Sequence, residues 1–429
     1  MVNLTDEAIN ISSDLIKINS VNPSFNGPGE WEKSRYVVNK LKEYCKKYNI
    51  KNYILKEYNI KDNNGIIRPN ILFKIDFNCD RTLHIISHLD TVPPGDLSLW
   101  DNDPFTPVVK DGYIYGRGSE DNHKAIVSSF LLLKMLYGDE KENKEKKEKK
   151  VNFNLSLIFL SDEECGSVYG IQHLLKYRSE IFNKDDIIIV PDFGSEDGTY
   201  IEIAEKNILW LKFKVRGKQC HGSTPDNGVN ADIIMFNFGN DLYNYLYSRY
   251  NLEDNIFTPP YSTFEPTICG NNVENTNTIP GYGELHFDCR ILPHYNVDDI
   301  LNDIDNFIKE YLSNFENKGY LIKYDKKELQ NIQITYDILN LERSKKIDEN
   351  SYSVVLLKRA IKEVIKKEPR VCGMGGGTIG AFLREKEYDT VVWGIGEETA
   401  HQPNEHIKIN DLIKMAEVFY HILTNKLSR

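Results

Sequence analysis

The chain has 429 residues, a length that allows two domains of the usual size. Hydrophobic residues make up 40% of it and charged residues 27%, which is the composition of an ordinary globular protein and not of a disordered one. The net charge of −11 argues against a nucleic-acid-binding surface, for which a basic patch is expected.

The seven cysteines are scattered singly and form no Cys-x-x-Cys pair, so we expect free thiols in a reducing, cytoplasmic compartment. The N-terminal residues lack a basic region followed by an apolar core, and therefore predict no secretory signal. No run approaches the length of about 18 apolar residues that a membrane span needs, so no membrane partner is expected.

The first part of the chain alternates between helical and extended patterns, which is typical of an α/β sheet covered by helices. Apolar residues near helical spacing predict two helices, and β-rich runs predict strands after them. The predicted helices cover residues 5–17 and 31–48, and the predicted strands cover residues 52–58, 70–76 and a run that begins at Leu83.

That third strand ends abruptly in polar residues, at His88-Leu89-Asp90, before a Pro-Pro-Gly turn. Ligands of open α/β sheets bind beyond the carboxyl ends of the strands, which is where this pair falls. A histidine that binds a metal usually donates its other ring N–H to a carboxylate or carbonyl, and Asp90 is well placed for that. Taken alone, the pair is better explained by a hydrogen-bonded histidine near the surface than by a metal site.

A glycine-containing segment, Gly116-Arg117-Gly118-Ser119-Glu120-Asp121, leads into an apolar helix that ends near Tyr137. The glycines permit a tight turn, and Asp121 lies close to the start of the helix. Taken alone, helix capping by an acidic residue explains Asp121 at least as well as a metal site does.

Two further apolar strands also end in carboxylates. The strand at residues 151–160 is followed by Asp162-Glu163-Glu164, and the strand at residues 186–190 is followed by Asp192. Successive carboxylates at the end of a buried strand repel one another unless cations compensate. The sequence therefore predicts that three strands bring His88, Glu164 and Asp192 to one edge of the sheet.

After Lys206 the pattern changes to the order βαββαβ, which is the split arrangement of ferredoxin-like domains. We therefore expect a second domain at residues 207–337, inserted into a first domain formed by residues 1–206 and 338–429. Its predicted strands cover residues 208–216, 261–269, 283–292 and part of 320–336, and its helices cover residues 231–247 and 297–315.

The α/β pattern resumes with a helix at residues 351–367, followed by a glycine-rich loop at residues 373–378 whose N–H groups could hold an anion. A short strand at residues 390–393 precedes Ala400-His401-Gln402-Pro403-Asn404-Glu405, and a last helix covers residues 410–423. The charge run within residues 138–150 is expected to be solvated.

Five motifs occur in a fixed order: His88-x-Asp90, Gly-Arg-Gly-x-x-Asp121, Asp-Glu163-Glu164-x-Gly, Asp192 and Ala-His401-x-x-Asn-Glu. In this the chain resembles the two-zinc amidohydrolase and exopeptidase family of succinyl-diaminopimelate desuccinylase, acetylornithine deacetylase, aminoacylase and glutamate carboxypeptidase. The resemblance covers nearly the whole chain. It implies a zinc-exopeptidase-like α/β catalytic domain with a central mixed sheet, interrupted by a ferredoxin-like α+β lid and dimerisation domain.

The resemblance further implies that Asp121 bridges two metal ions. His88 and Asp192 would complete one site, and Glu164 and His401 would complete the other. Nitrogen and oxygen ligands suit two Zn²⁺ per subunit, and Co²⁺ or Mn²⁺ would also fit. Glu163 would act as general base and then general acid, with Asp90 behind His88.

Substrate-facing residues are implied in and near the inserted domain. His221, in a loop similar to the family's histidine loop, would donate to the oxyanion, often across a dimer, although a surface histidine explains it as well. Asn277, Arg290 and the loop residues Gly376, Gly377 and Thr378 would contact substrate. An ion pair with Asp288 is the structural alternative for Arg290.

Two departures from the family's motifs weaken the transfer of specificity. His123 and Lys124 follow Asp121 where Asp-Met-Lys-Gly-Gly is usual, and the arginine associated with a succinyl group is missing, with Arg384 nearby. We expect hydrolysis of an N-acylated amino acid, of the desuccinylase or acetylornithine deacetylase type, by a homodimer. A dipeptidase or carboxypeptidase acting on dipeptides is the alternative, and a non-catalytic binding homologue is disfavoured because every ligand type is present.

Overall fold

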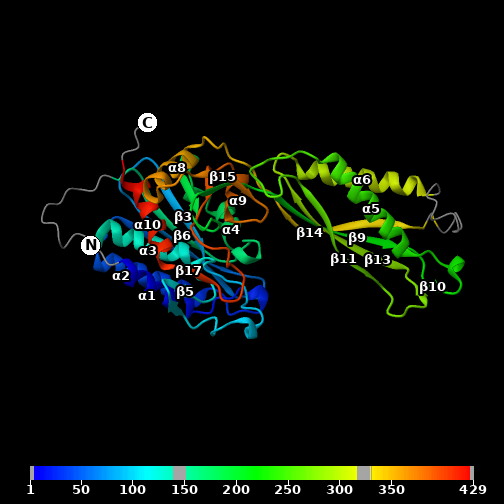
Figure 1. Ribbon diagram of the computed structural model, residues 1–429, viewed down its shortest axis with the longest axis horizontal. Helices are drawn as coiled ribbons and strands as arrows, with labels where there is room; N and C mark the ends of the chain where they lie inside the picture. Colours follow the sequence, from blue (N-terminus) through cyan, green and yellow to red (C-terminus); the bar gives the residue numbers. More distant parts are fainter. Residues whose placement is uncertain (1–3, 139–150, 316–328, 330, 426–429) are drawn as a thin grey trace. The chain divides into compact units, whose positions relative to one another are not determined.

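The computed structural model describes residues 4–138, 151–315, 329 and 331–425 (Figure 1). The chain divides into two compact units, each described by itself below. Unit 1 comprises Met1–Ile203, Ile347–Cys372 and Thr378–Arg429, and unit 2 comprises Ala204–Lys346 and Gly373–Gly377. The second unit is thus longer at both ends than the inserted domain expected from the sequence.

An eight-stranded mixed sheet forms the centre of unit 1, in the order β1-β2-β6-β3-β7-β16-β8-β15. Strands β6, β3, β7 and β16 run parallel to one another, whereas β1 and β2 at one edge and β8 near the other are antiparallel to their neighbours. The strands are β1 (Tyr53–Lys61), β2 (Ile67–Ile75), β3 (Thr82–His88), β6 (Asn154–Leu160), β7 (Ile187–Val190), β8 (Tyr200–Glu205), β15 (Arg370–Met374) and β16 (Thr390–Val392).

Helices cover both faces of this sheet. On one face α1, α3, α8 and α10 pack on one another and α2 packs on β2, while α4 and α9 pack on the other face over a core that includes Ile158 and Ile188. The strands β3, β6 and β7 are buried along their whole length, which explains their continuous apolar composition. The helices are α1 (Leu4–Ile16), α2 (Trp31–Lys47), α3 (His123–Tyr137), α4 (Ile171–Tyr177), α8 (Tyr352–Ile365), α9 (Ile379–Glu385) and α10 (Ile409–Thr424).

The parallel pairing of β6, β3 and β7 brings the carboxyl ends of these strands to one edge of the sheet. His88 is the last residue of β3, and the segments that follow β6 and β7 carry Glu163, Glu164 and Asp192. A separate small sheet, in the order β17-β5-β4, links the segment before Asp121 to the segment after His401. Its strands are β4 (Val108–Lys110), β5 (Tyr113–Tyr115) and β17 (His406–Lys408).

Unit 2 is a four-stranded antiparallel sheet in the order β11-β13-β9-β14, with α5 packed on it and α6 beside α5 (Figure 1). Alternate residues of β13 are buried, which is the pattern of a sheet with one covered face. The chain order is β9 (Asn207–Arg216), β10 (Cys220–His221), α5 (Ala231–Arg249), β11 (Thr263–Asn271), β12 (Thr278–Ile279), β13 (Tyr282–Ile291), α6 (Val297–Ser313) and β14 (Gln333–Glu342).

The α/β class and the central mixed sheet expected from the sequence are confirmed, while β8 and β15 were not anticipated. Both carry charged residues and lack the continuous apolar runs that mark the predicted strands β6 and β7. The predicted charge run lies almost entirely outside the described residues. So does most of the region at residues 320–336, in which strand structure was expected and in which β14 begins at Gln333. Among the helices described, none is both long enough and apolar enough to cross a membrane.

Candidate functional site

Five side chains that are far apart in the sequence meet at the strand ends of unit 1. They form two groups that share Asp121: His88, Asp121 and Asp192 make one, and Asp121, Glu164 and His401 make the other. Within each group, one nitrogen or oxygen atom per residue lies within 4.8 Å of the others, a spacing that could hold a metal ion. These are the five residues that the sequence motifs single out.

His88 is held at the end of β3 with its ring buried. Its Nε2 atom lies 2.8 Å from Oδ1 of Asp121 and 3.5 Å from Oδ1 of Asp192. On the other side of the ring, Nδ1 lies 3.1 Å from the backbone carbonyl oxygen of Asp90 and 3.5 Å from its carboxylate. The carbonyl is therefore the nearer partner of the ring, and the Asp90 carboxylate has other partners.

Those partners are the backbone N–H groups of the turn that follows β6. We call residues 161–166 the glutamate turn, because its short 3₁₀ helix carries Glu163 and Glu164. Oδ1 of Asp90 accepts from the N–H of Glu163 at 3.1 Å, and Oδ2 accepts from the N–H of Glu164 at 3.2 Å. Asp90 thus fixes the backbone from which the two glutamates project.

Asp121 projects its carboxylate between the two histidines, with Oδ2 3.0 Å from Nε2 of His401. Its backbone N–H, together with those of Gly118 and Glu120, donates to the buried carboxylate of Glu405. Arg117 donates to the same carboxylate at 2.6 Å. The helix-capping alternative for Asp121 does not describe this arrangement, because α3 begins after Asn122 and its cap has no side-chain hydrogen bond.

Asp192 is held by a neighbouring segment, whereas His401 is largely exposed. Nδ2 of Asn122 donates to Oδ1 of Asp192 at 2.7 Å, so the residue after Asp121 positions the carboxylate that follows β7. His401 is the most exposed member of the cluster, with 53% of its side chain accessible, and its Nε2 lies 3.2 Å from Oε2 of Glu164. The cluster is therefore open to solvent on the His401 side.

Burial and neighbouring charges raise the pKa values of the two glutamates, and neighbouring carboxylates raise those of the two histidines of the cluster. Burial and the nearby Asp192 raise the pKa of Glu163 well above its usual range, and burial and Asp121 raise that of Glu164 to about 7. Hydrogen bonds that His401 donates to the carboxylates of Asp121 and Glu164 raise the pKa of His401 to about 10. Burial opposes a charge on His88, but Asp121 and the other carboxylates outweigh burial and raise its pKa. The cluster attracts positive charge.

The predicted substrate-facing residues lie mostly in unit 2. His221 is exposed on β10, with Nδ1 2.7 Å from Oγ of Ser223, and the backbone carbonyl of Asn277 accepts from the N–H of Gly222. Arg290 donates from Nε and Nη2 to Asp288 and from Nη1 to the carbonyl of Gly375. The ion pair offered as the structural alternative for Arg290 is therefore present.

In the glycine-rich loop, Gly377 lies against Glu342, since a side chain at that position would meet the Glu342 carboxylate at 2.6 Å. Gly376 precedes it in unit 2, whereas Thr378 is the first residue of the last segment of unit 1. The Thr378 hydroxyl accepts from the N–H of Gly380 and caps α9. Helix capping thus already explains Thr378.

The residues that depart from the family's motifs are buried. Nζ of Lys33 lies 2.6 Å from Nε2 of His123, and Lys124 pairs with Glu120. Arg384, considered above as a substitute for the missing arginine, is also buried and forms an ion pair with Glu202 at 3.0 Å. It does not reach solvent and is therefore a structural residue.

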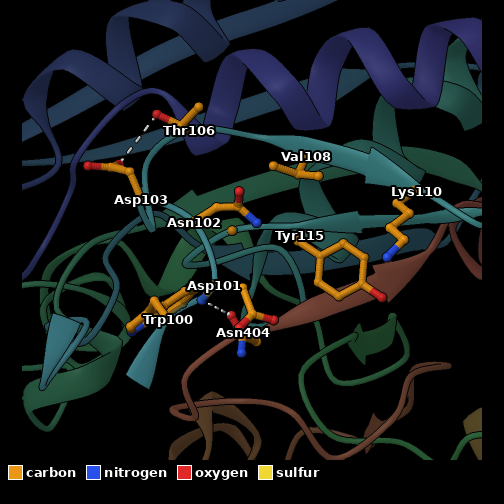
Figure 2. Close-up of a pocket in the computed structure, with 10 residues that line it drawn as sticks. Trp100, Asp101, Asn102, Asp103, Thr106, Val108, Lys110, Tyr115 and Asn404 are labelled. Atoms are coloured by element: carbon orange, nitrogen blue, oxygen red, sulfur yellow. Dashed lines mark hydrogen bonds between the residues drawn. The ribbon is translucent and has the colours of Figure 1, made fainter. Parts of the chain in front are cut away.

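A pocket lies behind the His401 segment, at the small sheet of unit 1 (Figure 2). Trp100, Asp101 and Tyr115 line it with Asn404, whose Oδ1 accepts from the N–H of Asp101 at 2.9 Å. The Trp100 ring also lies 5.2 Å from the Arg117 guanidinium, which holds Glu405. The pocket wall therefore supports the segment that carries His401 and Glu405.

Sequence reasoning did not single out several residues that hold this site. Asn122 and Glu405 stand inside the recognised motifs, so their position was the available signal. Asn22 and Arg68 stand in a loop and a strand far from any motif, and no local pattern marks them. Their contacts, described further below, arise only from the tertiary structure.

A model of peptidase family M20/M25/M40 matches residues 84–425, which is most of the chain. A mixed α/β sheet that gathers imidazole and carboxylate groups at its strand ends is the architecture of a metal-dependent hydrolase. The chain belongs to peptidase family M20/M25/M40, and it is a metallohydrolase of that family. The resemblance inferred from the five motifs is thereby confirmed.

Individual relatives cover the chain end to end. An "uncharacterized metallohydrolase" of Methanocaldococcus jannaschii is 61% identical over 98% of this chain and 100% of its own length. A succinyl-diaminopimelate desuccinylase of Pelagibacter ubique is 24% identical over 98% of this chain and 99% of its own.

Among solved structures, the aminopeptidase PepT of Bacillus cereus matches with a TM-score of 0.70 at 20% identity, covering 98% of both chains. A dinuclear metal-binding M20 peptidase of Bacillus subtilis matches with a TM-score of 0.58 at 12% identity, covering 98% of this chain and 97% of its own. At these identities the two structures establish the fold.

Glu405 offers a test of how the Asp121 segment is held. Glu405→Gln removes the charge that Arg117 and three backbone N–H groups neutralise, and turns one acceptor into a donor. We expect Zn²⁺ binding to weaken by about 10- to 100-fold, as for other residues that orient metal ligands. Titration with a chromogenic chelator measures this, with exposed Glu398→Gln as the control. Unchanged Zn²⁺ affinity in Glu405→Gln would contradict the role.

Proposed function

We propose that this protein is a two-metal amide hydrolase. His88, Asp121 and Asp192 would hold one ion, and Asp121, Glu164 and His401 would hold the other. The observation that carries the proposal is the pair of three-residue groups that share Asp121, each with its ligand atoms within 4.8 Å of one another. Asp121 offers one carboxylate oxygen to each histidine, as a bridging ligand must.

The residues present fit divalent cations. Asp121, Glu163, Glu164 and Asp192 carry as much negative charge as two divalent ions carry positive charge. Oε1 of Glu164 is buried and has no hydrogen-bond partner in the described part of the chain, as expected of an atom whose partner is an ion. Imidazole and carboxylate ligands suit Zn²⁺, and Co²⁺ or Mn²⁺ would also fit.

When bound, two such ions orient a water molecule and polarise the amide carbonyl. Glu163 would take the proton from that water and later give it to the leaving nitrogen. Its position supports this role, because Oε2 of Glu163 lies 4.0 Å from Nε2 of His88 without belonging to either ligand group.

The substrate that we propose is an N-acylated amino acid, as for the desuccinylase and acetylornithine deacetylase types. The full-length similarity to a succinyl-diaminopimelate desuccinylase supports this class. Arg290, with Asn277, Gly376, Gly377 and Thr378, would hold the substrate, and the Arg290 fork suits a carboxylate. The second candidate is a dipeptidase or carboxypeptidase, which the structural likeness to an aminopeptidase favours.

Unit 2 would serve as lid and dimerisation domain of a cytoplasmic homodimer, with His221 as an oxyanion donor. The antiparallel sheet with two helices on it supports the ferredoxin-like assignment of this unit. The exposed position of His221 leaves its ring accessible to a ligand.

Glu163→Gln tests the proposed function most directly. The amide cannot take a proton, so we expect kcat to fall by about 10²- to 10⁴-fold. Glu163 is outside both ligand groups, so elemental analysis should still find two metal ions per chain. Glu180→Gln, an exposed residue of unit 1, serves as control. Full activity of Glu163→Gln, or active wild-type protein without metal, would refute the proposal.

A substrate panel separates the two candidate functions. The Zn²⁺-loaded protein is assayed against N-succinyl amino acids, N-acetyl amino acids and dipeptides, and kcat/KM is compared. We expect the N-acyl amino acids to give the highest values, because the Arg290 fork would hold their carboxylate while the acyl group lies beyond the scissile bond. Turnover of dipeptides alone would establish the peptidase instead.

His221→Ala tests the proposed oxyanion donor. Loss of a donor that acts in the transition state should lower kcat by about 10²- to 10³-fold, with a smaller effect on KM. Steady-state kinetics on the preferred substrate measure both parameters. His294→Ala, another histidine of unit 2, is the control. A kcat equal to that of the wild type would remove His221 from the mechanism.

A further inference from the structure

A chain of buried polar side chains lies behind the glutamate turn, on the side away from the metal-ligand groups. It runs from Glu30, just before α2, through Arg68 on β2 to Asp162 in the turn, and from there through Asn22 to Asp90. All five residues are 2% exposed or less. Buried charged and amide groups cost folding free energy unless each has a hydrogen-bond partner, so the partners within this network show what it holds in place.

Arg68 provides the cation of this network. Its Nε and Nη2 atoms donate to the two carboxylate oxygens of Glu30 at 3.0 and 2.6 Å. Nη2 also donates to Oδ1 of Asp162 at 3.0 Å. The planar fork thus joins two carboxylates at once, which a lysine ammonium on a flexible stem does not reproduce.

Asp162 turns the chain from β6 into the glutamate turn, with a positive φ of 72°. Its carbonyl accepts from the N–H of Ser167 at 2.6 Å, and Oδ2 accepts from the N–H of Tyr169. Its own N–H donates to Glu30 at 3.2 Å. Arg68 therefore holds Asp162, whose hydrogen bond with Ser167 closes the turn.

Asn22 connects the two carboxylates that hold the turn. Its Nδ2 donates to Oδ2 of Asp90 at 2.7 Å and lies 3.3 Å from Oδ1 of Asp162. Since Asp90 in turn accepts from the N–H groups of Glu163 and Glu164, the backbone of the turn is fixed at both ends.

The restraint opposes electrostatic repulsion. Glu163 and Glu164 lie close to the carboxylates of Asp121 and Asp192, and repulsion between like charges in a buried site pushes the turn outward. An unrestrained turn would move both glutamates away from the other groups when no cation is present. A displacement of about 1 Å at a reacting group can cost about 10²-fold in rate.

We propose that Arg68 and Asn22 are positioning residues that hold the glutamate turn in place for catalysis. They act through Asp162 and Asp90 and contact neither substrate nor metal. The inference rests on the proposed function, because it assigns these residues to the turn that carries the proposed base and one proposed ligand.

Arg68→Lys tests the inference, because lysine keeps the charge and loses the fork. We expect kcat to fall by about 10- to 100-fold with KM within about threefold of the wild-type value, since the base is displaced and the substrate contacts are not. We also expect one of the two Zn²⁺ equivalents, the one proposed for Glu164 and His401, to bind about 10- to 100-fold more weakly. Chelator titration and steady-state kinetics give the two readings.

Arg35→Lys is the matched control, because Arg35 also pairs with a glutamate, Glu57, but lies partly exposed and away from the turn. It should leave kcat and both Zn²⁺ equivalents unchanged. A purely structural Arg68 would lower the melting temperature of Arg68→Lys while leaving kcat and both Zn²⁺ equivalents as in the wild type, and this result would overturn the inference.

If Arg68→Lys does not fold, Asn22→Ser decides by the same two readings. Serine can still cap the short helix after residue 22 but cannot bridge Asp90 and Asp162. The failure of this inference is distinct from failure of the proposed function. Inactive Glu163→Gln with fully active Arg68→Lys rejects only the positioning role, whereas fully active Glu163→Gln rejects the function itself.

Discussion

Electrostatic repulsion is the main constraint on unit 1, because four carboxylates gather near the carboxyl ends of its buried strands. Asp192 and Asp121 help to raise the pKa values of Glu163 and Glu164, and Asp121 and Glu164 raise the pKa of His401. Such a cluster costs folding free energy unless positive charge enters it. We propose that divalent cations bound among these carboxylates offset this cost.

The backbone around the cluster is organised to resist that repulsion. Asp90 holds the N–H groups of Glu163 and Glu164, and Glu405 holds those of the Asp121 segment. Asp90 and Glu405 are the supporting carboxylates, and both are themselves buried and hydrogen-bonded. Arg117 pairs directly with Glu405, whereas Arg68 pairs with Asp162, which Asn22 connects to Asp90. The segments of Glu163, Glu164 and Asp121 are therefore held mainly through their main-chain N–H groups.

Burial also explains the departures from the family's usual motifs. His123, Lys124 and Arg384 each contact a partner inside unit 1 and none of them is an exposed substrate contact. These three residues therefore pair buried charges or polar groups within unit 1. The substrate contacts that we propose lie instead mostly in unit 2.

The sequence by itself determined the α/β class, the main strands and helices, and the five residues that the structure brings together. Strand periodicity is local, and polar residues that interrupt a buried strand stand out wherever they occur, so both signals survive without coordinates. Local pattern marked His88, Glu164 and Asp192, whereas Asp121 and His401 entered through the family resemblance, which also supplied the expected roles. The same reasoning placed His88 beside Asp90, but did not reveal that the nearer contact is the Asp90 carbonyl.

Only the tertiary structure decided what supports the site. Asn22 and Arg68 lie 140 and 94 residues before Asp162, and no periodicity connects them with it. Their contacts exist because β2 pairs with β6 and the loop after α1 folds against the ends of β3 and β6. Sheet order is a property of the whole packed chain, and for that reason the sequence motifs mark the candidate metal ligands but not the residues that hold them.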